Sequence, residues 1–142
     1  MGGRRNMKTI RYLLLTIFFL CAGQLSHAAD KNGNYVMGGG VGGVKCSQFV
    51  ASMEKGRSFG IGSYEYVIET YGFQMYLLGF QTGYNMGAPE TYDIFYGYES
   101  TNELLARIEN FCRIIPDVTF GFAVTSLGKK LHPKRKKNEI MK

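Results

Sequence analysis

Histidine is scarce in this chain of 142 residues, which contains only His27 and His132. Each lies close to a predicted processed or solvated end of the chain, so neither is expected to act as a buried general base for a serine or cysteine nucleophile. Carboxylate pairs such as Glu65 with Glu69 have a spacing that is common on solvated faces. The sequence therefore predicts no catalytic residues and no enzyme activity.

Strong metal ligands and cofactor-binding motifs are also few. Besides His132, only the thiols of Cys46 and Cys112 are strong ligands in the part of the chain expected to be exported, and both thiols are expected to be oxidised. The run GGGVGG at 38–43 formally fits G-x-G-x-x-G, but no βαβ unit surrounds it. No metal site and no cofactor are predicted.

No apolar run is long enough to span a bilayer. The best candidate, from Leu13 to Ala22, has about ten strongly apolar residues, whereas a spanning helix needs roughly 20. Basic residues precede this run and small residues follow it. This order predicts that 1–28 is a signal peptide, cleaved after Ala28 or the next alanine, with Met7 as an alternative start. The mature protein is therefore expected in the periplasm.

A basic folded face is lacking as well, although the whole chain has a formal net charge of +6. Without the predicted signal peptide, 13 basic and 11 acidic residues remain, and seven of the basic ones fall in the tail at 129–142. The body at 29–128 has a formal charge of −4. No nucleic-acid partner is predicted. The tail is expected to stay solvated, and weak contact with an anionic envelope surface is the alternative.

Two cysteines, Cys46 and Cys112, remain after the predicted cleavage. An oxidising compartment favours their pairing. A bridge across 66 positions is worth about 4 kcal/mol in the chain-entropy model, which matters for a small domain. The sequence therefore predicts one disulfide; two unpaired buried thiols are the alternative.

Helical periodicity follows a Gly-rich flexible leader at 29–43, so a helical domain is expected at 44–128. The first helix is expected to end at Gly56, and its inner face repeats every three or four residues. That face consists of Cys46, Phe49, Val50 and Met53.

A longer helix is expected at about 63–85, with two apolar stripes that imply burial on most sides. Gly79 and Gly83 each lower the helix propensity by about 1 kcal/mol, so close packing of a neighbouring helix is expected to compensate. Asn85 is expected to stop the helix. One stripe contains Tyr64, Ile68, Tyr71, Met75 and Leu78, and the other contains Phe73, Tyr76, Leu77, Phe80 and Tyr84.

Four aromatic residues gather in a predicted loop at 86–99, namely Tyr92, Phe95, Tyr96 and Tyr98. Tyrosine and phenylalanine rings supply large contact areas, so these residues are the candidate partner-binding surface. The alternative is that the four rings cap the core.

Two further helices complete the predicted domain. Ser100 and Glu103 match a capping box, and Cys112 lies on the inner face of the helix that follows. Pro116 fits the first turn of a last helix that ends at Gly128. The sequence therefore predicts an all-α, four-helix domain whose disulfide ties the first helix to the third. Strands at 35–37 or 118–124 are the alternative.

Three short segments carry a family resemblance: CSQFV at 46–50, YLLGFQTGYN at 76–85, and FC at 111–112 followed by Pro116 and Ala123. Together they resemble small exported bacterial helical proteins, a group similar to the acid-stress chaperones of the HdeA type and to the Rap1a/Tai immunity proteins. The immunity proteins protect against type VI secreted peptidoglycan-cleaving toxins. The resemblance covers about 46–127, but the cysteines are more widely spaced than in the chaperones, and the extra cysteines of the immunity proteins are missing.

This resemblance implies a periplasmic domain that binds another protein without catalysis. In an immunity-like role the partner would be a toxin, sequestered through the loop at 86–98. In a chaperone role, protonation of the carboxylates would leave a strongly positive chain, loosen its packing and expose apolar surface to an unfolded client. Pairing with a second copy of the chain remains open.

Overall fold

The computed structural model describes residues 39–137. Its elements in chain order are the 3₁₀ helix η1 (Gly40–Gly43), the helices α2 (Cys46–Ser58), α3 (Tyr64–Gly87), α4 (Thr101–Ile114) and α5 (Phe120–Leu131), and the 3₁₀ helix η2 (His132–Lys134). The described residues form no strand, only two isolated bridges. The prediction of an all-α domain with four helices is therefore confirmed. The predicted signal peptide at 1–28 and the alternative strand at 35–37 lie outside the described residues.

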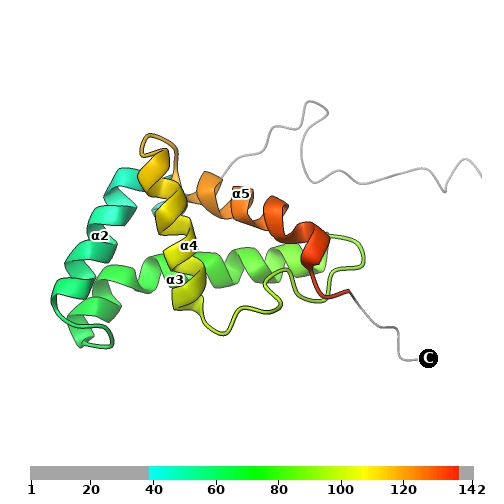
Figure 1. Ribbon diagram of the computed structural model, residues 1–142, viewed down its shortest axis with the longest axis horizontal. Coiled ribbons are helices and arrows are strands. Elements are labelled where there is room, and N and C mark those ends of the chain that lie inside the picture. The colour runs from blue at the N-terminus through cyan, green and yellow to red at the C-terminus, as the bar shows by residue number, and fades with distance from the viewer. Residues whose placement is uncertain (1–38, 138–142) are drawn as a thin grey trace, which may run out of the picture. The chain divides into compact units, whose positions relative to one another are not determined.

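The helices pack around a cluster of aromatic rings. Figure 1 shows α2 against one end of α3, α4 crossing α3, and α5 extending along the other half of α3. Phe49 of α2, Phe73 of α3 and Phe120 of α5 meet with ring centroids 4.6–4.9 Å apart. Aliphatic side chains of α3, α4 and α5 surround these rings: Leu77, Leu105, Ile108 and Val124. Three segments that are far apart in the sequence thus share one core.

The disulfide joins Cys46, the first residue of α2, to Cys112 near the end of α4. Both residues are fully buried, and their Cα atoms lie 4.8 Å apart. The predicted bridge between the first and third helices is confirmed.

The end of α2 differs from the prediction because Gly56 lies inside the helix, which continues to Ser58. A Cβ atom at Gly56 would lie 3.2 Å from the Tyr66 ring and 3.4 Å from Thr70 on α3. This glycine therefore permits close approach of two helices and does not end one.

The last helix begins later than predicted. Pro116 lies before α5, where its carbonyl oxygen accepts a hydrogen bond from the Ser47 amide. The Thr119 hydroxyl caps α5 by accepting from the Phe122 amide, which satisfies a donor that the first turn leaves free. The alternative strand at 118–124 is wrong, because α5 starts at Phe120.

The other end of α5 also differs from the prediction, because the helix continues through Gly128 to Leu131. A Cβ atom at Gly128 would lie 2.7 Å from the Phe80 ring of α3. The glycine therefore makes room for an aromatic ring between α3 and α5.

The predicted capping box of α4 is present in altered form. The Ser100 hydroxyl accepts from the Glu103 amide at 3.2 Å. The Glu103 carboxylate accepts from the amide of Glu99, not from that of Ser100. Both contacts lie at the start of α4, where free amides and the helix dipole favour acceptors and negative charge.

The end of the predicted flexible leader is part of the folded domain. Gly42 is buried, and a Cβ atom there would collide with the Tyr76 ring. After it, the Phe120 amide donates to the Val44 carbonyl, and the Cys46 amide donates to that of Val118. The folded part therefore includes Gly40–Gly43, with Gly42 fitted against the Tyr76 ring of α3.

Helix α3 is less buried than its two apolar stripes predicted. The stripe with Phe73 and Leu77 faces the core, whereas the stripe from Tyr64 to Leu78 is exposed. Within the described residues no other helix packs closely at Gly79 or Gly83, because a Cβ atom at either would meet nothing within 4 Å.

The C-terminal end of α3 also departs from the prediction. Asn85 does not stop α3, which continues to Gly87. None of the helices among residues 39–137 combines the length and the apolar character that crossing a membrane requires.

Candidate functional site

The loop between α3 and α4 is held in place from α3. The Asn85 side-chain oxygen accepts from the Ile94 amide at 2.9 Å. Asp93 accepts from both the Gln81 side chain, at 2.8 Å, and the Phe95 amide, at 2.9 Å. Asn85 therefore holds the loop against α3 by a side-chain hydrogen bond and does not end the helix.

The four aromatic residues of the loop have different surroundings. Tyr92 and Tyr96 are exposed over 60% and 59% of their surface, whereas Phe95 is only 3% exposed. Tyr98 is half-buried against the core. Phe95 is therefore a core residue and not a contact residue, while the two exposed tyrosines are available to a partner.

The chain after α5 is bound to this loop. The amide of Lys136 donates to the Asp93 carbonyl, and the Lys136 carbonyl accepts from the amides of Tyr92 and Asp93. The Arg135 guanidinium donates to the Thr91 hydroxyl at 3.0 Å. Residues 129–137 of the predicted tail are therefore folded against the domain, although their lysines are exposed, and 138–142 lie outside the described residues.

A second contact supports the same junction. The Tyr84 hydroxyl of α3 and Nδ1 of His132 lie 2.9 Å apart. Burial raises the pKa of Tyr84, against the opposing charge of Arg135, so the hydroxyl is protonated at neutral pH. His132 thus serves as a packing and hydrogen-bonding residue between α3 and η2.

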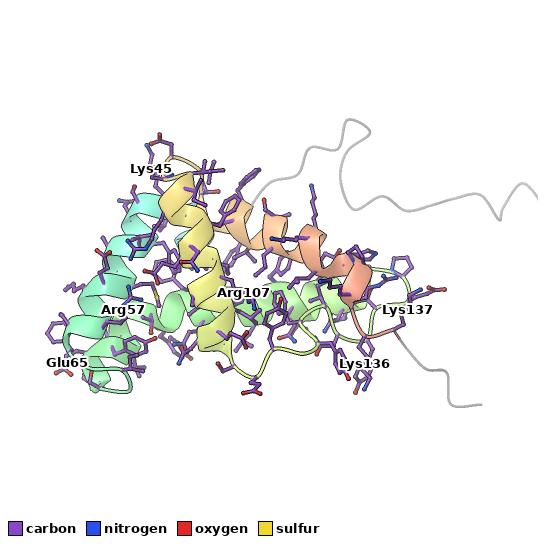
Figure 2. All side chains as sticks on the ribbon, viewed as in Figure 1. Lys45, Arg57, Glu65, Arg107, Lys136 and Lys137 are labelled. Atoms are coloured by element: carbon purple, nitrogen blue, oxygen red, sulfur yellow. A yellow bond between two sulfur atoms is a disulfide. The ribbon has the colours of Figure 1, made fainter. Side chains whose placement is uncertain are left out.

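Lys136 lies beside both exposed tyrosines. Its Nζ atom is 5.4 Å from the ring centroid of Tyr92 and 5.3 Å from that of Tyr96. Figure 2 shows Lys136 and its neighbour Lys137 on the chain after η2, next to the loop. Cation–π contact at an exposed site contributes about 0.5–1 kcal/mol, so the ammonium group helps to order the two rings.

A groove of about 410 Å³ lies between α4 and α5. Its floor is apolar, and its edges carry the cationic side chains Arg107 and Lys130. A smaller hollow of about 200 Å³ continues from it and adds Tyr96 and Lys134. The apolar residues of the groove are Ile108, Phe111, Ala123, Leu127 and Leu131.

Arg107 and Tyr98 lie where the two hollows meet. The guanidinium of Arg107 stacks 4.9 Å from the centroid of the Tyr98 ring and pairs with Glu103 at 3.3 Å. Figure 2 shows Arg107 on α4. Arg107, Lys130 and Lys134 outnumber Glu103, the one acidic residue among those that line the hollows. We call this continuous region, from the groove to Tyr92 and Lys136, the groove–loop surface.

The groove–loop surface can hold apolar side chains on its floor and carboxylates at its edges. Arginine binds a carboxylate with two parallel hydrogen bonds, and lysine supplies a point charge. In the described residues, no three His, Cys, Asp or Glu side chains gather in a way that could hold a metal ion. The groove–loop surface is therefore suited to bind a ligand that has both apolar and acidic groups.

Only the loop part of this surface is predictable from the sequence. Arg107 had no assigned role, and Lys130 was counted in a solvated tail, because α5 was expected to end at Gly128. Helical spacing offered a usable indication, since Ala123, Leu127, Lys130 and Leu131 recur every three or four residues along α5. The sequence does not show that α4 lies opposite this face of α5, because that depends on the tertiary packing.

Comparisons of this chain with models of protein families, with curated proteins and with solved structures found no match. The resemblance to small exported helical proteins of the HdeA and Rap1a/Tai types therefore stays a prediction from the sequence.

Proposed function

We propose that this chain is a non-enzymatic, periplasmic protein-binding domain that captures an acidic segment of another protein in the groove–loop surface. The observation that carries the proposal is the groove between α4 and α5, with its apolar floor and its cationic edges at Arg107 and Lys130. A segment with carboxylates on either side of aliphatic or aromatic side chains would match both features. The exposed tyrosines of the loop would extend the contact.

Apolar contact and charge have different roles in this proposal. Tyrosine and arginine dominate the binding energy of many protein interfaces, and Tyr96, Tyr98 and Arg107 lie together here. Exposed charges mainly increase the association rate and set specificity, and salt weakens their effect. Binding should therefore be salt-dependent without being abolished by salt. By the sequence resemblance, a secreted toxin with an acidic loop is the kind of partner proposed.

A selection of displayed 12-residue peptides on the purified chain would test the binding chemistry. We expect the enriched peptides to combine Asp or Glu with aromatic or aliphatic residues. In fluorescence anisotropy with one such peptide, the double variant Arg107→Glu/Lys130→Glu should bind at least tenfold more weakly, because both edges of the groove change sign. Tyr92→Ala/Tyr96→Ala should weaken binding less, by a few fold.

Lys129→Glu is the matched control, since Lys129 lies on α5 next to Lys130 but does not line the groove. It makes the same change of charge as Lys130→Glu alone, which should weaken binding, but Lys129→Glu should keep wild-type affinity. Peptides without an acidic preference, or equal losses in Lys129→Glu and Lys130→Glu, would contradict the proposal.

A second candidate function is an acid-activated chaperone, favoured by one buried carboxylate. Glu109 of α4 accepts two hydrogen bonds from Arg57 of α2, at 2.7 and 2.8 Å, and a third from Arg113. The side chain of Glu109 is only 8% exposed. The hydrogen bonds from Arg57, followed by those from Arg113, hold the pKa of Glu109 below its ordinary value although burial opposes them. Acid would remove an ionic link between α2 and α4.

We expect Glu109→Gln to be less stable than the wild type at pH 7 by about 1–2 kcal/mol, because two arginines lose a charged acceptor and water already screens the half-exposed guanidiniums. The folded-state pKa is depressed, so this stabilisation is present above the unfolded-state pKa of about 4.3 and is lost as the pH falls through the lower folded-state value. Urea denaturation between pH 7 and pH 2 measures this. The difference between the two proteins should shrink below about pH 4.

The chaperone role itself needs a loosened state that binds clients. Near pH 2–3, dye binding and suppression of client aggregation should appear together in the wild type. A chain that stays compact at that pH and leaves client aggregation unchanged has no such role.

A further inference from the structure

One face of α3 is apolar and exposed along the length of the helix. It comprises the exposed stripe from Tyr64 to Leu78 and five further residues, Val67, Gly79, Thr82, Gly83 and Met86, and its large apolar side chains are 39–85% exposed. Glu65 and Glu69 are the charged residues of this 24-residue helix, and neither belongs to the stripe. The members of the α3 face are Tyr64, Val67, Ile68, Tyr71, Met75, Leu78, Gly79, Thr82, Gly83 and Met86.

The area of the α3 face is that of a protein interface. A large side chain has roughly 200 Å² of surface, so these exposed fractions amount to roughly 800 Å² of apolar-residue surface. The largest apolar patch on a typical monomer covers about 300–600 Å². Each partner in a standard interface contributes about 800 Å². The α3 face is thus large enough to support one stable, specific contact.

The order of large and small residues on this face is complementary to itself when reversed about Met75. In an antiparallel pair of α3 helices centred there, each residue faces the one equally far from Met75 on the other side. Tyr71 then faces Gly79 of the partner subunit, where a Cβ atom would meet nothing within 4 Å of the same chain. Val67 faces Gly83 of the partner subunit, which is equally open.

Three further positions of the α3 face fit the same register, whereas Leu78 faces Gly72 of the partner subunit, which lies outside the face. Ile68 faces Thr82 of the partner subunit, Tyr64 faces Met86 of the partner subunit, and Met75 faces itself across the two-fold axis. Facing helices interlock best when large side chains lie opposite small ones. A two-fold contact requires one patch to complement itself, and the α3 face meets this requirement.

We propose that the α3 face pairs with the α3 face of a second copy of this chain, antiparallel and centred on Met75. A bilayer surface fits less well, because helices that lie on membranes carry lysine and arginine beside the apolar face, and α3 has no basic residue. The proposal does not rest on the groove–loop surface, since no residue of the α3 face lines the groove or the hollow beside it.

The oligomeric state in solution is the first test. Sedimentation of the wild-type chain should show a species of twice 15.9 kDa (or twice the mass after processing) that dissociates on dilution. Met75→Glu places two carboxylates against each other on the axis and should weaken the dimer at least 100-fold. Ala106→Glu adds the same charge at an exposed position of α4 and should leave the dimer unchanged.

Gly79→Leu distinguishes pairing in the proposed register from non-specific association of apolar surfaces. The substitution enlarges the apolar surface, so a face that associates without register would associate more strongly. In the proposed pair, the new side chain occupies the space of Tyr71 from the partner subunit and should weaken the dimer at least tenfold. The circular dichroism spectrum of each variant should match that of the wild type.

Cysteine cross-linking tests the register directly, in a chain with Cys21→Ser so that no other free thiol competes. Met75→Cys should form a disulfide-linked dimer on mild oxidation. Tyr64→Cys and Met86→Cys should cross-link only when the two variants are mixed, because the two copies of each lie about 33 Å apart at 1.5 Å per residue.

Several results would overturn the proposal. A wild-type chain that stays monomeric at 100 µM would do so, and would leave the α3 face to the N-terminal segment before Gly39 or to a bilayer. A dimer that survives Met75→Glu would place the contact elsewhere on the chain. A dimer that Gly79→Leu strengthens would show that the α3 faces associate without the proposed register. A dimer in which Met75→Cys fails to cross-link would exclude the antiparallel arrangement.

Discussion

Replacing Cys46 and Cys112 together by alanine is expected to lower the free energy of unfolding by about 3–4 kcal/mol. The bridge closes a loop of 66 positions, and opening it restores freedom to the unfolded chain. Small single domains have total stabilities of about 5–15 kcal/mol. The bridge therefore accounts for a large part of the stability of this domain.

Urea denaturation of the oxidised wild type, the reduced wild type and the double alanine variant measures this effect. Both cysteines are fully buried, and alanine avoids placing a polar hydroxyl in the core. The reduced wild type should fall close to the variant, since both lack the cross-link. A loss of less than about 1 kcal/mol in the free energy of unfolding would show that the unfolded chain is constrained by something other than the bridge.

Phe120→Ala is expected to destabilise the fold by about 3–5 kcal/mol. The ring of Phe120 is fully buried and lies 4.6 Å from that of Phe49, 4.9 Å from that of Phe73 and 5.6 Å from that of Tyr76. Its removal leaves a cavity at the point where α2, α3 and α5 meet, and large core rings cannot all move to fill it.

Phe122→Ala is the matched control two residues further along α5. Phe122 is 44% exposed, and its ring contacts Phe111 at a centroid distance of 6.4 Å. We expect its loss to cost less than about 1 kcal/mol. Equal costs for the two variants, measured by urea denaturation with unchanged slope, would contradict the assignment of Phe120 as the centre of the core.

Helix positions followed from the sequence where an apolar repeat coincided with a chemical start signal. The Ser100 hydroxyl caps α4 as its spacing from Glu103 indicated. Helix ends are predicted less accurately, because the local sequence indicates stops at Gly56 and Gly128, whereas α2 and α5 continue beyond them. Both glycines lie inside helices, where an aromatic ring of another helix occupies the space that a side chain would need. That neighbour cannot be inferred from local sequence.

The candidate site was predicted in part for a similar reason. Tyr92 and Tyr96 of the predicted contact surface are exposed, whereas Phe95 is buried. Which of the four rings is buried depends on how the loop folds over α3, and the local sequence does not specify this. The contribution of Lys136 depends on a backbone bridge to Asp93. Residues 43 positions apart in the sequence gave no local indication of that contact.

The all-α class, the four helices and the pairing of Cys46 with Cys112 follow from local periodicity and capping and from the prediction that Cys21 is removed with the signal peptide. Which of the two α3 stripes is buried does not follow from the sequence, because both are apolar and the outcome depends on where α2, α4 and α5 pack. For the same reason, the groove lined by Arg107 and Lys130 exists only once α4 and α5 lie side by side.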